Sequence, residues 1–123
     1  MNPTSGRVLV VDDERTLREL LRDFLSGDGY EVITVASGAE ALEAAPTFQP
    51  DVILLDMSMP GMSGTEVLGA LRRTGLTMPV VILSGTPQPA GQEFFGVLLK
   101  PFDLRKLAAI VAAAVVFRRS PGA

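Results

Sequence analysis

The sequence of 123 residues contains no cysteine and no histidine. Without cysteine, the protein has no disulfides, no thiolate metal ligands and no cysteine nucleophile. Without histidine, it lacks the usual general base at neutral pH and the commonest metal ligand. These two absences exclude Ser-His-Asp hydrolysis and histidine-based zinc chemistry before any motif is considered.

Long apolar runs and an excess of positive charge are missing as well. The longest apolar run, 107–117, has eleven residues and is too short to span a bilayer as a helix. The polar start of the chain does not fit a secretory signal. We therefore expect a cytoplasmic protein with no membrane insertion. Eleven basic against fourteen acidic residues give a net charge of -3, which predicts no direct contact with nucleic acid.

The length predicts a single domain over residues 1–123, with a core at about 7–117 and a tail at 118–123. Apolar runs typical of buried strands lie at 7–11, 30–35, 51–55, 79–83 and 96–99. Helical patterns lie between them, at 15–25, 37–45, 63–73 and 103–117, and Pro46 is expected to stop the second helix. Strands that are apolar on both faces are typical of a parallel sheet covered by helices on both sides. The sequence therefore predicts a doubly wound α/β fold with five strands.

Four of the five predicted strands are followed by, or end on, a polar residue. Asp12 and Asp13 follow the first strand, Asp56 the third and Lys100 the fifth, and the fourth ends at Ser84. Because ligands of doubly wound sheets bind at the carboxyl ends of the strands, we expect these side chains to converge. Clustered carboxylates repel one another unless one takes up a proton or a cation binds, and oxygen donors without His or Cys suit Mg2+. Such a set can hold a phosphoryl group, and a carboxylate can accept it as a nucleophile.

Each of these residues also has a simpler structural interpretation. One aspartate of the pair Asp12 and Asp13 could cap the following helix, although a cap needs only one. Ser84 before Gly85 is common turn chemistry. The stem of Lys100 could be buried while its ammonium group reaches solvent.

The chain resembles the receiver domain of two-component response regulators along nearly its whole length. The matching segments are Val-Val-Asp-Asp-Glu at 10–14, Asp-Val-Ile-Leu-Leu-Asp-Met-Ser-Met-Pro-Gly-Met-Ser-Gly at 51–64, Val-Val-Ile-Leu-Ser-Gly at 80–85 and Lys-Pro-Phe at 100–102. The resemblance implies a flavodoxin-like, three-layer fold with strand order 2-1-3-4-5.

The resemblance also implies a role for each site residue. Asp56 would be the phosphoacceptor. Asp13 and Asp56 would bind Mg2+ directly, Asp12 largely through water, and the backbone carbonyl of Ser58 would be a further ligand. Lys100 and Ser84 would bind the phosphoryl group, and the Lys100–Pro101 peptide would be cis.

The implied partners are a sensor histidine kinase or phosphotransfer protein and an unknown output protein. The chain would not be an enzyme beyond phosphorylating itself from small phosphodonors and dephosphorylating itself. Two alternatives stay open. One is a Mg2+-dependent phosphatase with Asp56 as nucleophile, which lacks a histidine and a domain to close over a substrate. The other is a phosphorylation-independent interaction module with an atypical output face.

Two features depart from the family pattern. Val97 stands where the family usually carries an aromatic residue, a role that Phe94 or Phe95 could take over. Only sixteen positions (100 minus 84) separate Ser84 from Lys100, and proline and glycine residues occur within 87–91, so we expect the fourth helix to be short or absent.

The last helical pattern is apolar all round at 107–117, which predicts contact of its outer face with a second copy, as a homodimer, or with a partner. Small exposed alanines are the simpler explanation.

Overall fold

The computed structural model describes residues 5–86 and 93–119 of the chain. Five strands form one parallel sheet in the order β2-β1-β3-β4-β5. Their bounds are Gly6–Val11 for β1, Tyr30–Val35 for β2, Val52–Asp56 for β3, Val80–Ser84 for β4 and Gly96–Leu99 for β5. The predicted α/β class and strand order are confirmed.

Four helices are present in the described ranges: α1 at Arg15–Gly27, α2 at Gly38–Phe48, α3 at Gly64–Arg73 and α4 at Leu104–Arg119. Serine caps start two of them. The Ser37 hydroxyl accepts the Glu40 amide N–H at the start of α2, and Ser63 and Glu66 form a full capping box at the start of α3. Both helices therefore begin where the sequence pattern predicts.

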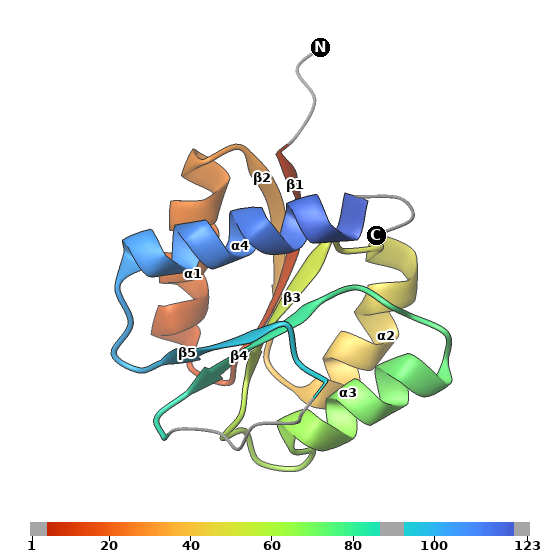
Figure 1. Ribbon diagram of the computed structural model, residues 1–123. Helices are drawn as coiled ribbons and strands as arrows, with labels where there is room; N and C mark the ends of the chain where they lie inside the picture. Colours follow the sequence, from red (N-terminus) through yellow and green to blue (C-terminus); the bar gives the residue numbers. More distant parts are fainter. Residues whose placement is uncertain (1–4, 87–92, 120–123) are drawn as a thin grey trace.

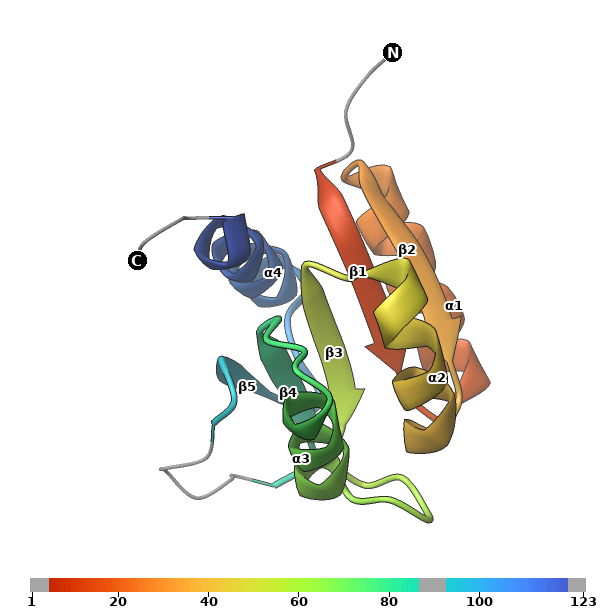
Figure 2. The same ribbon diagram turned by 90° about the vertical axis from the view of Figure 1, so that its right-hand side faces the viewer.

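Helices cover both faces of the sheet (Figures 1 and 2). Apolar strand residues alternate between two cores, one on each side of the sheet. In β1, Val8 and Val10 face α1 and α4, while Leu9 and Val11 face α2 and α3. Every residue from Val8 to Val11 is fully buried. The result is the predicted three-layer arrangement, with the sheet between two pairs of helices.

Helix α2 continues past Pro46 to Phe48, so the prediction that Pro46 stops it is wrong. A proline removes one amide donor, but the next turn still closes, because the Gln49 N–H donates to the Ala45 carbonyl at 2.9 Å. The Phe48 ring packs against the core beneath α2 and α3, and this contact favours the extra turn. The helix ends at Phe48, and the C-cap residue Gln49 has a positive φ of 55°.

The connection between β4 and β5 is not helical at 85–86 or at 93–95. The rest of the segment in which we expect the fourth helix to be short or absent, residues 87–92, lies outside the described residues. The described part of the connection thus agrees with the expectation. Between α3 and α4 the chain passes through β4 and β5 (Figure 1).

Helix α4 lies across the sheet on the side of α1 (Figure 1). It buries Leu107, Val111 and Ala114, and exposes Val116 and Phe117 by 66% and 57%. Part of its outer face is therefore apolar and exposed, while the predicted contact of this face with a second copy or a partner stays a prediction. In the described ranges, no helix combines the length and the hydropathy needed to cross a membrane.

Candidate functional site

Three carboxylates meet at the carboxyl ends of β1 and β3, whose arrowheads point the same way in Figure 2. Asp12 and Asp13 directly follow β1, and Asp56 is the last residue of β3. One oxygen of each carboxylate lies within 4.8 Å of one oxygen of each of the others. Asp12 is fully buried, Asp56 is 3% exposed and Asp13 is open to solvent. The predicted convergence of the three aspartates is therefore present.

Several hydrogen bonds fix Asp12 in this cluster. Its backbone N–H donates to the Val35 carbonyl at 3.1 Å, which extends the pairing of β1 with β2 by one residue. Its carbonyl accepts a hydrogen bond of 2.8 Å from Arg18 Nη1, and its Oδ1 accepts the Glu14 amide N–H at 2.9 Å. The second carboxylate oxygen, Oδ2, is the one that faces Lys100.

Neither Asp12 nor Asp13 caps α1. The N-cap residue is Glu14, whose side chain makes no capping hydrogen bond. Asp12 instead closes a local turn through the Glu14 amide. The simpler capping interpretation of the aspartate pair is therefore wrong.

Lys100 reaches the cluster from the edge strand. Its backbone N–H donates to the Ser84 carbonyl at 2.7 Å, so the residue is held beside the end of β4. Its Nζ lies 3.3 Å from Asp56 Oδ1 and 3.4 Å from Asp12 Oδ2, and the side chain is 29% exposed. These contacts are longer than the usual 2.7–2.9 Å of charged hydrogen bonds. The Lys100–Pro101 peptide is cis, as the resemblance implies.

The cluster carries more negative than positive charge. Burial, and then the neighbouring Asp56, raise the pKa of Asp12, against the lowering influence of the Glu14 N–H and Lys100. Burial by itself would lower the pKa of Lys100, but the two carboxylates outweigh it and the pKa is raised. Lys100 therefore stays charged, and among the described residues it is the one positive charge in contact with this group of three carboxyl side chains. Three carboxylates at this spacing are a donor set that fits a hard divalent cation.

The two predicted serines lie next to Asp56 in different ways. The Ser58 N–H donates to Asp56 Oδ1 at 3.2 Å, so Ser58 contacts the carboxylate through its amide. Ser84 is 1% exposed and ends the strand beside β3. Its hydroxyl donates to the Thr86 carbonyl at 2.6 Å and accepts the Thr86 N–H at 3.2 Å. The hydroxyl of Ser84 thus contacts its own turn in this structure.

Sequence reasoning missed Arg18, which supports the site from α1. A cation in the first turns of a helix opposes the helix dipole, so it usually has another partner. Helix α1 has no acidic residue in its first turn, while Arg15 and Arg18 both lie near its start. That unfavourable placement was the available signal for the contact of Arg18 with the Asp12 carbonyl.

The fold and the cluster together define a doubly wound α/β protein with an acidic pocket at the carboxyl edge of its sheet. The family model described as "Response regulator receiver domain" matches residues 8–112, so the chain belongs to that family. Proteins of this family act as signalling domains.

The chain is 42% identical over 116 residues to the transcriptional regulatory protein KdpE of Mycobacterium tuberculosis, and the match covers 88% of this chain and 50% of KdpE. It is 40% identical over 117 residues to the response regulator MprA of Mycobacterium ulcerans, covering 89% and 50%.

Solved receiver structures share the fold. A Francisella response regulator receiver domain superposes with a TM-score of 0.85 at 27% identity, covering 93% of this chain and 99% of that one. The chemotaxis protein CheY4 of Vibrio cholerae gives a TM-score of 0.81 at 31% identity, covering 89% and 98%. The chain spans about half the length of the curated relatives it matches. Because KdpE is by name a transcriptional regulator, these relatives do not support the expectation of no direct contact with nucleic acid.

Proposed function

We propose that this chain accepts a phosphoryl group on Asp56, in a Mg2+-dependent reaction, from a sensor histidine kinase or phosphotransfer protein. The observation that carries the proposal is the surroundings of the Asp56 carboxylate. It is nearly buried, lies within 4.8 Å of two further carboxylates, and has Lys100 Nζ at 3.3 Å. A carboxylate with a cation site and an ammonium group beside it suits nucleophilic attack on phosphorus.

Asp12, Asp13 and Asp56 are the side chains that would hold Mg2+, together with the backbone carbonyl of Ser58. The donor set supports this assignment, because all three side chains offer hard oxygen ligands. When bound, Mg2+ would neutralise the charge on phosphoryl oxygens. Asp12 would remain anchored through its contacts with Arg18 and Glu14.

In the transfer, one Asp56 carboxylate oxygen forms a bond to phosphorus. The phosphorus–nitrogen bond of the donor phosphohistidine breaks, and its electron pair leaves with the imidazole nitrogen. Lys100 is placed to exchange a carboxylate contact for a phosphoryl oxygen. The Ser84 hydroxyl would have to exchange the Thr86 carbonyl for a phosphoryl oxygen, which requires the turn at 85–86 to rearrange.

The test uses acetyl phosphate as a small phosphodonor and intact-mass spectrometry. The wild-type protein is expected to gain one phosphoryl group with Mg2+ and none with EDTA. Asp56→Asn is expected to gain none under either condition. Asp23→Asn is the matched control, because Asp23 is an exposed carboxylate on α1 and should leave the adduct unchanged. An adduct that persists in Asp56→Asn would overturn the assignment.

Two other functions predict different results in the same experiment. A phosphatase would release phosphate from p-nitrophenyl phosphate over many turnovers. A phosphorylation-independent module would form no Mg2+-dependent adduct. One observation favours this second candidate: Val97, where the family usually has an aromatic residue, is already 38% exposed and carries no ring that could change position.

Output through protein contacts belongs to the same proposal. The exposed Val116 and Phe117 at the end of α4 support a contact with an output protein or a second copy. Sedimentation with and without beryllofluoride separates the two kinds of partner, because the fraction of dimer would increase with protein concentration. A monomer at high concentration under both conditions would leave the output protein as the partner.

A further inference from the structure

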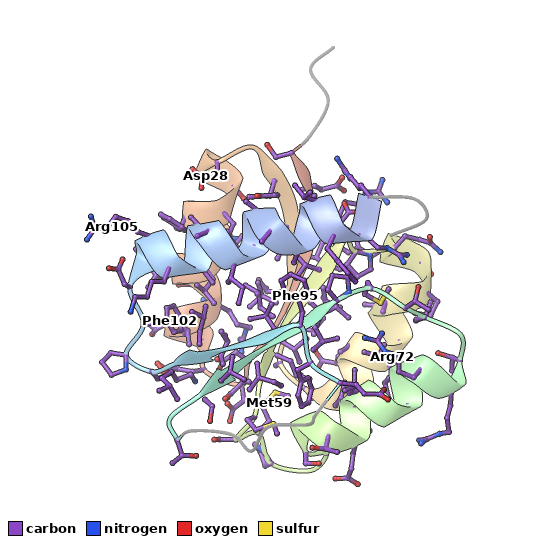
Figure 3. The ribbon with its side chains drawn as sticks, viewed as in Figure 1. Asp28, Met59, Arg72, Phe95, Phe102 and Arg105 are labelled. Carbon is purple, nitrogen blue, oxygen red and sulfur yellow. The ribbon has the colours of Figure 1, made fainter. Side chains whose placement is uncertain are left out.

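A second pocket lies at the opposite edge of the sheet from the acidic cluster. It has a volume of about 340 Å³ and is formed where α3, the starts of β4 and β5, and the end of α4 meet. Figure 3 labels two of its lining residues, Arg72 and Phe95. The pocket opens at the amino ends of β4 and β5, whereas the acidic cluster lies at the carboxyl ends of the strands. The two places are therefore separate sites.

Three phenylalanine rings form the apolar wall of this pocket. Phe94 packs against the core beneath α2 and α3, and Phe95 against the core beneath α1 and α4. The rings of Phe95 and Phe117 lie 5.5 Å apart at an angle of 50°. Phe117 is nevertheless 57% exposed, so much of its ring is uncovered beside the pocket. Rings held in place in this way suit a flat apolar ligand.

One guanidinium group, that of Arg72, lines the pocket, and a second, that of Arg118, contacts the lining residue Thr77. Arg72 Nη1 donates to the Leu76 carbonyl at 2.9 Å, and Arg118 Nη1 donates to Thr77 Oγ1 at 2.8 Å. Both contacts hold the side chains over the loop from α3 to β4. Burial lowers the pKa of Arg72, and Arg118 lowers it further, while Glu93 opposes this.

The charged side chains in and next to the pocket carry a net positive charge. Glu93 is the acidic residue among those that line the pocket, and it is exposed. Arg72 and Arg118 together exceed its single charge. A guanidinium group is planar and presents several N–H donors, a geometry that matches the two oxygens of a carboxylate or sulfonate.

We propose that this pocket binds a small planar organic anion, such as an aromatic carboxylate. The phenylalanine rings would contact the flat apolar part, and Arg72 would bind the acid group. A volume of about 340 Å³ lies at the small end of ligand pockets, which favours a ligand of one or two rings over a dinucleotide. None of its lining residues belongs to the acidic cluster, so the pocket is a site distinct from the phosphoacceptor.

The test uses the fluorescent sulfonate 1-anilinonaphthalene-8-sulfonate as the probe and naphthalene-2-carboxylate as a competitor. Arg72→Gln is expected to weaken probe binding by about tenfold or more, because a charged hydrogen bond is lost. Arg73→Gln is the matched control, since Arg73 is the exposed neighbour on α3 and does not line the pocket. Phe117→Ala is expected to weaken binding by about tenfold. Leu20→Ala, an exposed apolar residue on α1 that does not line the pocket, should change it by less than about twofold.

Two further measurements fix the location and the need for a charge. The competitor should shift the backbone amide resonances of Phe94, Phe95 and Thr77, and Asp56→Asn should bind it as the wild type does. The neutral alcohol 2-naphthylmethanol should bind at least about tenfold more weakly than the carboxylate. Equal binding of the neutral analogue would overturn the proposal. So would probe binding that is unchanged in both Arg72→Gln and Phe117→Ala when circular dichroism shows that each is folded.

Discussion

Replacing Asp12 by asparagine should stabilise the protein when no divalent cation is present. At an effective dielectric constant of about 20, two like charges at the 4.8 Å upper limit of the carboxylate spacing repel by about 3.5 kcal/mol. Asp12 has two such neighbours in Asp13 and Asp56, whereas its attraction to Lys100 at 3.4 Å is about 5 kcal/mol on the same scale. The balance is a net repulsion of about 1–2 kcal/mol, because the exposed Asp13 is partly screened by solvent.

Asparagine keeps the side-chain oxygen that accepts the Glu14 N–H but removes the charge. Urea unfolding in EDTA at low salt, followed by circular dichroism, should therefore show a free energy of unfolding about 1–2 kcal/mol higher for Asp12→Asn than for the wild type. Asp23→Asn, on the exposed face of α1, should change it by less than about 0.5 kcal/mol.

The pH dependence has a definite sign. The folded-state pKa of Asp12 is raised above its ordinary value of 3.8. Between the ordinary pKa of the unfolded state and the raised pKa of the folded state, the native protein binds more protons than the unfolded protein. The free energy of unfolding of the wild type therefore falls as pH rises through this window. The destabilisation is fully present above the raised pKa. Asp12→Asn should show a flatter profile over the same window.

Magnesium should narrow the difference in stability between the two proteins. A wild-type protein in Mg2+ at ten times its dissociation constant gains about 1.4 kcal/mol, and Asp12→Asn should gain less because one ligand has lost its charge. An Asp12→Asn variant that is less stable than the wild type in EDTA by more than about 1 kcal/mol, with an unchanged pH profile, would refute a net repulsion at Asp12.

Three further predictions concern single residues. Lys100→Met should slow phosphorylation by acetyl phosphate, and an unchanged rate would contradict the role assigned to Lys100. The same variant should lower the free energy of unfolding by roughly 2 kcal/mol, because two buried carboxylates lose their counter-charge. Gly38→Ala should cost about 1–3 kcal/mol in urea unfolding, because its Cβ would lie 2.6 Å from Val67 Cγ2 between α2 and α3; a neutral effect would show that the two helices can move apart. Ser63→Ala should cost about 1 kcal/mol by removing the cap of α3, whereas Ser26→Ala in the last turn of α1 should be close to neutral.

Sequence reasoning located the acidic cluster because the topology leaves little freedom there. Asp12 and Asp56 directly follow buried runs on strands that pair in parallel, so both must leave the sheet at the same edge. Lys100 obeys the same rule on β5. The positions of these side chains follow from strand polarity alone, which the alternation of apolar runs predicts.

Other contacts depend on local packing that the pattern does not contain. The Arg18 contact with the Asp12 carbonyl depends on how closely α1 approaches the first loop, and the Ser84 hydroxyl depends on the geometry of its own turn. Pro46 shows the same limit for the fold. The local rule predicts a stop there, but burial of the Phe48 ring favours one more turn of helix.

The most direct test of phosphorylation at Asp56 is to locate the phosphoryl group chemically. The wild-type protein is treated with acetyl phosphate and Mg2+ and reduced with borohydride, which converts an aspartyl phosphate to homoserine, and its peptides are then sequenced by mass spectrometry. Homoserine is expected at position 56 and at neither 12 nor 13. Homoserine at 12 or 13, or unmodified aspartate at all three positions in a folded protein, would contradict this expectation.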